Sequence, residues 1–156
     1  MGIERDSPMT TDQNKEVVRR FFRAFEDQDE AGLIRVLSTN LQAYVHGNTE
    51  PVDRDTMLQA IKGWNAMFSG TSFTLEDQVA EGDLVACRVT MHAVHSGGEF
   101  EGIAAAGAPI ASESLTLERV VDGLIVERRV VSNWEDIKQQ LTAVPSQAQA
   151  RVSAGA

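Results

Sequence analysis

The chain has few of the residues that build covalent or metal-centred sites. Its 156 residues include one cysteine and three histidines. A lone cysteine forms no internal disulfide, and Cys87 lies in an apolar strand pattern that is typical of a buried, inert thiol. The histidines lack the spacing of metal ligands, so no metal is predicted. G-x-S-x-G, P-loop and G-x-G-x-x-G motifs are missing too, and no cofactor is predicted.

Positive charge is also scarce. The chain has 14 Lys and Arg residues against 23 Asp and Glu residues, which gives a net charge of −9 and a pI of about 4.7. Such a charge repels phosphate backbones and anionic lipid surfaces, so neither nucleic acid nor membrane is an expected partner. No apolar run is long enough to cross a bilayer. The first fifteen residues lack the pattern of a secretory signal, and we expect a cytoplasmic protein.

The length and composition predict one domain. The chain is 42% hydrophobic and 24% charged, as in ordinary globular proteins. A chain of this size buries an adequate core without disulfides or metals. We expect the domain to cover residues 10–142, with flexible termini at 1–9 and 143–156, because the tail is small and polar.

Three helices are predicted before any long strand. Thr10, Thr11 and Asp12 offer an N-cap for a first amphipathic helix, whose apolar residues are Val17, Val18, Phe21, Phe22 and Phe25. A short helix is expected from Asp29 to Leu37, then a brief strand from Leu41 to His46. Asp53 caps a third helix carrying Trp64 and Met67.

The period then changes to two, which predicts strands over 73–79, 84–95, 111–121 and 124–133. The Asp122-Gly123 pair is a strong hairpin signal, and Gly82-Asp83 is a weaker one. The Gly-rich stretch from Ser96 to Pro109 is expected to be a long loop, and such loops are often functional. A last short helix is expected over 133–141. The fold class is therefore α+β, with helices packed on a curved, mostly antiparallel four-stranded sheet.

The alternation along these strands predicts one apolar face toward the helices. On the second strand this face carries Val85, Cys87, Val89, Met91, Ala93 and His95. On the next strand Leu115 and Leu117 are expected on the same side, and Ser114, Thr116 and Glu118 on the other. An apolar pocket between sheet and helices would follow from this arrangement. Its expected lining residues are Trp64, Phe68, Phe25, Met91, His95, Leu117, Val131 and Trp134.

The last strand carries charge on both faces. If Ile125, Glu127, Arg129, Val131 and Asn133 face the pocket, two opposite charges lie within an apolar chamber, where they must pair or bind something. In the alternative register Glu127 and Arg129 face solvent while Val126 and Val130 are core. The sequence alone leaves both registers open.

The histidines have plain structural interpretations beside any catalytic one. His95 on the apolar face is more often a satisfied core or strand-end residue than a catalyst. His46, before Gly47 and Asn48, lines the pocket mouth or is a simple loop residue. His92 is expected on the convex face.

Three segments of the chain are distinctive: NKEVVRRFFRAFEDQD, HAVHSGGEFEGIAAAGAPI and VVDGLIVERRVVSNWEDIKQQL. They resemble the SnoaL-like polyketide cyclases of the nuclear transport factor 2-like superfamily, and the resemblance covers roughly residues 14–141. It implies a cone-shaped α+β barrel, a dimer or tetramer, and an aromatic polyketide bound in the interior. A homodimer formed through the outer sheet face is expected, with Arg88, Thr90, His92, Glu118, Val126 and Val130 there.

Two departures from the cyclase pattern E-x-W-x-x-x-D affect the expected chemistry. Asn133 occupies the position of the pattern's Asp, which the resemblance implies is the acid–base residue, and Arg129 occupies the position of the pattern's Trp. An amide does not shuttle a proton near neutral pH, so the usual cyclase role fails at this position.

Three functions are therefore weighed. The resemblance includes a branch of polyketide hydroxylases that work without a cofactor. Hydroxylation of this kind would use Arg129, Asn133 and Trp134 to stabilise a substrate phenolate and a peroxide. A partner reductase would prepare the substrate. Aldol cyclisation would take its base from His46, His95 or Glu127. A binding or dimerisation module is the third, because a fold does not determine a function.

Overall fold

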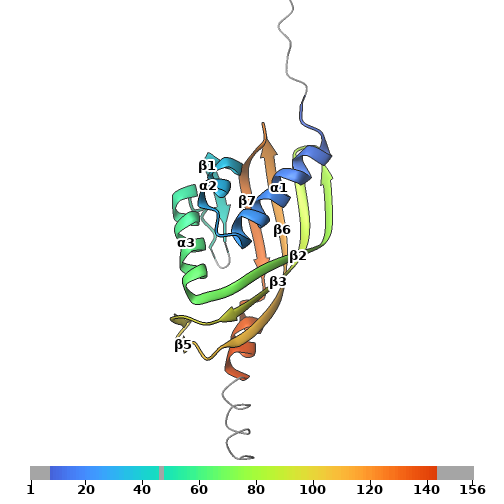
Figure 1. The fold of residues 1–156 in the computed structure, drawn as a ribbon. Coiled ribbons are helices and arrows are strands. Elements are labelled where there is room, and N and C mark those ends of the chain that lie inside the picture. The colour runs from blue at the N-terminus through green and yellow to red at the C-terminus, as the bar shows by residue number, and fades with distance from the viewer. Residues whose placement is uncertain (1–7, 46–47, 144–156) are drawn as a thin grey trace, which may run out of the picture.

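The structure is a computed structural model that describes residues 8–45 and 48–143 (Figure 1). Two helices, α1 (Thr11–Glu26) and α2 (Glu30–Val36), form a hairpin before β1 (Leu37–Tyr44) and α3 (Arg54–Met67). The remaining strands are β2 (Phe68–Glu81), β3 (Leu84–His95), β4 (Glu99–Phe100), β5 (Ile103–Ala104), β6 (Ala108–Val121) and β7 (Leu124–Ser132). A fourth helix occupies 134–143. The expected flexible termini fall largely outside these residues and stay a prediction.

The predicted helix starts are confirmed. The Thr10 hydroxyl accepts a hydrogen bond from the Gln13 backbone N–H, and the Gln13 side chain accepts one from the Thr10 N–H, which is a capping box. Asp53 caps α3 through the Thr56 N–H. These caps satisfy backbone donors that the first helical turn leaves without partners.

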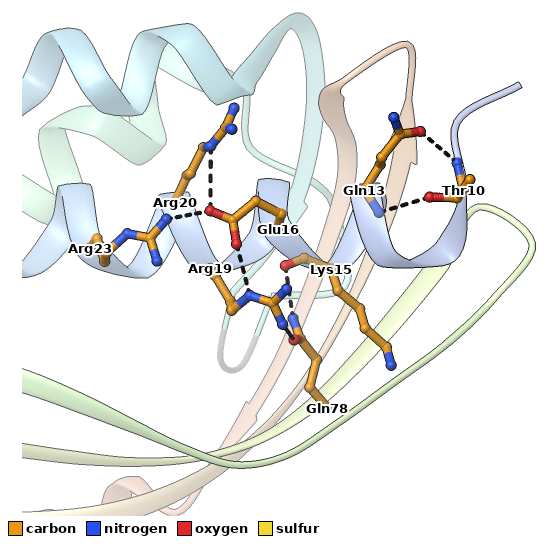
Figure 2. Close-up of polar contacts among 8 residues, drawn as sticks. All are labelled: Thr10, Gln13, Lys15, Glu16, Arg19, Arg20, Arg23 and Gln78. Atoms are coloured by element: carbon orange, nitrogen blue, oxygen red, sulfur yellow. Dashed lines mark hydrogen bonds and ion pairs between the residues drawn. The ribbon is translucent and has the colours of Figure 1, made fainter. Parts of the chain in front are cut away.

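Polar contacts fasten α1 to the edge of the sheet (Figure 2). Glu16 forms ion pairs with Arg19, Arg20 and Arg23 along the exposed side of the helix. Arg19 also donates to the Gln78 side-chain oxygen on β2, and Gln78 donates back to the Lys15 carbonyl oxygen. The apolar side of α1 therefore stays over the sheet, where Figure 1 shows the helix lying across one face.

The main sheet has five strands in the order β1-β7-β6-β3-β2, so the four-stranded prediction is wrong. The strand expected at 41–46 begins earlier, at Leu37, and joins β7 in parallel, which makes the sheet mixed. The other pairings are antiparallel, as predicted. Within the described residues the sheet has two open edges, β1 and β2, and does not close into the expected barrel.

The hairpin turns form where glycine was expected to allow them. Asp122 and Gly123 have φ of 51° and 77° between β6 and β7, and Gly82 has φ of 57° between β2 and β3. These left-handed conformations suit tight antiparallel connections. The expected long loop after β3 contains the small β4-β5 hairpin.

The inward face of β3 is confirmed, because Val85, Cys87, Val89, Ala93 and His95 are all buried. The face assigned to β6 is wrong. Leu115 and Leu117 are 57% and 36% exposed, whereas Ser112, Thr116 and Glu118 are buried with Ser114 on the same side of the strand. The register explains this result, since Thr116 pairs with Cys87 and Ser114 with Val89, and cross-strand partners share a face.

A bulge decides the register of β7. Val120 pairs with Ile125 but Arg119 pairs with Glu127, so one extra residue lies between them. Ile125 is fully buried, and after the bulge the inward side is taken by Arg128 rather than Glu127 or Arg129. Neither single alternation considered from the sequence describes the whole strand, because the bulge switches the strand's faces midway.

Two packed clusters lie on the concave side of the sheet. The larger joins α1, α2 and α3 to β1, β3 and β7. The smaller joins the β4-β5 hairpin to residues 134–143 and includes Phe68, Phe100, Ile137 and Leu141. In the described part of the chain, no helix has the length and apolar character needed to span a membrane.

Candidate active site

A cavity of about 200 Å³ lies between the helices and the concave face of the sheet. Residues from α1, α3, four strands of the sheet and the last helix line it, together with Val45 just after β1: Phe21, Phe22, Phe25, Val45, Met57, Ala60, Ile61, Trp64, Phe73, Val89, Met91, Ser112, Ser114, Thr116, Arg128, Val130, Ser132, Trp134 and Ile137. This volume is below the roughly 300–1,000 Å³ of drug-sized ligand sites. The cavity therefore suits a compact, largely apolar occupant.

Aromatic rings of α1 and β2 line part of the cavity. Phe25 and Phe22 lie with ring centroids 5.0 Å and 5.1 Å from that of Phe73 on β2. Phe21 packs edge-on against both helix neighbours. The spacing of Phe21, Phe22 and Phe25 in α1 places all three on the side of the helix that faces the sheet.

Two tryptophans line another part of the cavity. Trp64 of α3 and Trp134 meet edge to face with their centroids 6.3 Å apart. The Trp64 indole N–H donates to Thr71, and its ring stacks on Phe68 at 4.0 Å. Trp134 stacks on Phe100 of the β4-β5 hairpin at 5.1 Å. The hairpin thus supports the cavity from behind the tryptophans, which gives the loop predicted at 96–109 a structural role.

Hydroxyl groups form a row along the sheet wall. Ser112, Ser114 and Thr116 follow each other at every second position of β6, and so share the inward face. The Ser114 and Ser132 hydroxyls are 2.8 Å apart across the β6-β7 pairing. Thr116 donates to the Glu118 carboxylate over 3.2 Å. Most of the cavity lining is apolar, but this wall is polar.

A buried ion pair stands at the end of the hydroxyl row. Glu118 of β6 and Arg128 of β7 are cross-strand partners, and the Arg128 guanidinium donates to the Glu118 carboxylate. Glu118 has no exposed surface and Arg128 is 7% exposed. The guanidinium carbon also lies 4.4 Å from the centre of the Phe21 ring. Burial raises the pKa of Glu118, and the neighbouring Arg128 opposes that shift.

Arg128 lines the cavity while Glu118 lies behind it. A guanidinium does not give up its proton in a protein, so Arg128 is a fixed positive charge beside an apolar chamber. The guanidinium also has several N–H donors that point in different directions, so it can donate to a bound molecule as well as to Glu118. The arrangement is suited to stabilising negative charge on a bound molecule.

The structure brings together four of the predicted pocket residues: Trp64, Phe25, Met91 and Trp134 line the cavity. Phe68 and His95 do not. Both are 1% exposed, and His95 stacks on Phe68 and donates from Nε2 to the Gly98 carbonyl oxygen at 3.0 Å. They are core residues beneath Trp64, which is the plain interpretation considered for His95.

The prediction that Leu117 and Val131 line the pocket is wrong. Val131 is 70% exposed, and both residues lie on the outer face of the sheet, away from the cavity. The bulge in β7 and the register of β6 cause both errors, since a shift by one residue moves a side chain to the opposite face.

The proposed catalytic residues also lie elsewhere. Arg129 and Glu127 pair with each other at 3.0 Å, half-exposed, and the Arg129 guanidinium covers the Tyr44 ring. Asn133 is exposed and caps the last helix, because its side-chain oxygen accepts the Asp136 N–H at 3.1 Å. His46 lies outside the described residues.

Sequence reasoning missed Arg128, Glu118 and the inward hydroxyls. The prediction that Glu127 and Arg129 face the chamber is wrong: the charge on the cavity wall is Arg128, and its partner Glu118 lies on β6 behind the wall. The pairing of β3 with β6 would have predicted these hydroxyls, because Ser114 lies opposite buried Val89 and Thr116 opposite buried Cys87. Among the described residues no three His, Cys, Asp or Glu side chains gather as metal ligands would.

The profile of the SnoaL-like polyketide cyclases matches residues 15–141. The chain belongs to this family. Its members are polyketide cyclases and hydroxylases, so the cavity of this SnoaL-like protein is the candidate active site. A search of curated protein sequences gave no significant match.

Solved structures agree with this assignment. AclR from Streptomyces galilaeus, described as a candidate hydroxylase, is 26% identical, with a TM-score of 0.77 over 86% of this chain and 98% of its own. IdmH from Streptomyces antibioticus, described as a candidate polyketide cyclase, is 28% identical, with a TM-score of 0.75 over 83% and 99%. A SnoaL-like protein from Jannaschia, at 20% identity and a TM-score of 0.78, supports the fold.

Proposed function

We propose that this SnoaL-like protein is a tailoring enzyme that hydroxylates an aromatic polyketide held in the cavity. The observation that carries the proposal is Arg128, a buried positive charge on the cavity wall next to the inward hydroxyls of β6 and β7. A phenolate or enolate placed there gains a cation and hydrogen-bond donors in a site shielded from water.

The cavity walls favour a flat, phenolic substrate. The rings of Phe25, Phe73, Trp64 and Trp134 all line the cavity, and aromatic side chains pack well against a flat aromatic occupant. The serine and threonine hydroxyls accept and donate hydrogen bonds along one side only. A fused aromatic with oxygens on its edge satisfies both kinds of wall.

The reaction balances when the substrate is a reduced quinone. A ring C–H bond breaks and a C–O bond forms with one atom of O₂, while the second atom leaves as water. The hydroquinone supplies the two electrons and becomes a quinone. The protein's part is to hold the phenolate beside Arg128, where its electron density is available for attack on oxygen. A partner reductase that supplies the reduced substrate fits this balance.

Aldol cyclisation is the second candidate, and Glu118 is the observation that favours it. Its carboxylate accepts a hydrogen bond from Thr116, which lines the cavity, and burial raises its pKa above the ordinary value of a glutamate. A proton could pass from substrate to Glu118 through the Thr116 hydroxyl. The 28% identity to IdmH supports the same class of reaction.

The two reactions differ in their need for oxygen, because hydroxylation consumes O₂ and cyclisation does not. A chemically reduced anthraquinone is incubated with the protein under labelled O₂, and product mass is followed. One labelled oxygen per product supports hydroxylation, whereas ring closure of a polyketide ester precursor without oxygen supports cyclisation. Tight binding of both compounds without turnover would support a binding module instead. The Glu118→Leu/Arg128→Met double variant removes the cation while keeping an apolar fill, and we expect about a 10²-fold loss of hydroxylation.

The outer face of the sheet supports a homodimer, although two of the six residues expected there point inward. Arg88, Thr90 and His92 alternate with the buried residues of β3 and do lie on this face. Glu118 is fully buried and Val130 lines the cavity, whereas Leu115 and Val131 are exposed cross-strand neighbours. Together with Leu117 they form an apolar patch on this face. We infer that a second copy of the chain covers it, as isologous sheet-to-sheet packing allows.

A further inference from the structure

Ser112 differs from the other hydroxyls on the cavity wall. It is 3% exposed, lines the cavity, and its Oγ has no hydrogen-bond partner within the part of the chain that the structure describes. Ser114 and Ser132 bond each other, and Thr116 bonds Glu118. A buried hydroxyl without a partner is destabilising, so its presence requires an explanation beyond packing.

The backbone around Ser112 is firmly held. The Gln140 side chain bonds both the N–H and the carbonyl oxygen of Ala111, over 2.9 Å and 2.8 Å. Gln140 also donates to Asp136, whose own N–H is bound by Asn133. The last helix therefore fixes the strand immediately before Ser112, and a fixed position limits the ways in which the hydroxyl could find a partner within the protein.

Ser112 also lies far from the cation. Ser112 and Glu118, the partner of Arg128, stand at the two ends of the inward row on β6. An occupant whose anionic end lies near Arg128 would extend along this row toward Ser112, which stands opposite Met91 on β3.

We propose that the Ser112 hydroxyl binds an oxygen at the end of the substrate remote from Arg128. The substrate class is then a compact, flat aromatic polyketide that carries a phenol or carbonyl at both ends of its long axis. This inference rests on the proposed use of the cavity and adds to it the feature of the substrate that is recognised. Ser112 contributes to specificity, and Arg128 to charge stabilisation.

The test is a binding cycle with two probes. 2,6-Dihydroxyanthraquinone has a hydroxyl at each end of its long axis, and 2-hydroxyanthraquinone has one end bare. Their Kd values are measured by quenching of tryptophan fluorescence, since Trp64 and Trp134 line the cavity. We expect the wild type to prefer the dihydroxy probe about five- to tenfold, which is the usual effect of one hydrogen bond. Ser112→Ala should remove this preference and leave the Kd of the monohydroxy probe unchanged.

Ser114→Ala is the matched control, because it truncates the same side chain on the same face two residues away. It should retain the preference for the dihydroxy probe within about twofold, since Ser114 already has a protein partner. The midpoint of thermal unfolding of Ser112→Ala should be equal to or above that of the wild type, because no existing hydrogen bond is lost.

The outcomes separate this proposal from the proposed reaction. Equal weakening of both probes by Ser112→Ala, or no change in either, would overturn the role of Ser112. A preference abolished by Ser112→Ala in a protein that transfers no oxygen would overturn hydroxylation and leave the role of Ser112 intact. A wild type that binds neither probe would overturn both.

Discussion

Arg128 and Glu118 face each other across the β6-β7 pairing and form an ion pair that is almost wholly removed from water. Removing one member of such a pair leaves the other buried without compensation. Glu118→Gln keeps the size of the side chain and removes its charge. We expect this variant to lower the free energy of unfolding by about 3–5 kcal/mol in urea denaturation.

Glu113→Gln is the control for that measurement. Glu113 lies on the outer face of the same strand and pairs with Arg88 at an exposed site. Exposed pairs contribute about 0–1 kcal/mol, so this variant should unfold almost as the wild type does. Equal stability of the two variants would show that the Glu118 pair is not the buried, uncompensated charge described above.

Asn133→Ala should affect stability more than catalysis. The Asn133 side chain caps the last helix and lies outside the cavity lining, so its loss should cost about 0.5–2 kcal/mol of unfolding free energy. Asn133→Asp keeps a capping oxygen and should unfold like the wild type. Both variants should retain kcat/KM at temperatures where they are folded. A large loss of kcat in a stable Asn133→Asp protein would restore a catalytic role for this residue.

Cys87 should behave as a protonated, inert thiol at neutral pH. Burial raises the pKa of the Cys87 thiol to about 11, and the Glu118 carboxylate adds to the shift. A native pKa above the unfolded value of 9.0 means that the folded state binds the extra proton between these two pH values. The stability contributed by the neutral thiol is therefore complete below pH 9 and is lost as the pH rises toward 11, by roughly 2 kcal/mol.

Urea unfolding at pH 8 and near pH 11 measures this loss. Cys87→Ala serves as the control, because it lacks the titrating group and retains every other base-sensitive residue. The loss of stability between these pH values should be smaller in Cys87→Ala. Identical pH slopes for the two proteins, or rapid alkylation of native Cys87 at pH 8, would contradict the buried, neutral thiol.

Leu115→Glu tests the outer sheet face. Leu115 is exposed and pairs with exposed Val131, so a charge there should not disturb the core. If a second copy covers this patch, the variant should be monomeric by light scattering where the wild type is a dimer. A monomeric wild type, or a variant whose mass is unchanged, would remove the proposed interface.

Local rules predicted much of the architecture. Thr10 and Asp53 marked helix starts, Asp122-Gly123 marked a hairpin, and the alternation in β3 gave its buried face correctly. These features depend on short stretches of sequence, where capping and turn chemistry act directly.

The site was less accessible to the same rules because it depends on pairing between strands. Apolar Leu115 and Leu117 were assigned to the interior by their character, yet the β3-β6 register turns them outward and brings Ser114 and Thr116 in. The bulge in β7 between Ile125 and Glu127, opposite Arg119 and Val120, has no strong local signal, and after it Arg128 rather than Arg129 points inward.

The ionisation of a bound phenol tests the central claim most directly. The visible absorption of bound 2-hydroxyanthraquinone reports its phenolate, and a pH titration gives the pKa of the phenol in the cavity. The buried charge of Arg128 should lower this pKa below the value in water, and the Glu118→Leu/Arg128→Met variant should raise it above that value, because an apolar cavity alone disfavours the anion. A bound phenol whose pKa in the wild type exceeds the value in water would contradict the account.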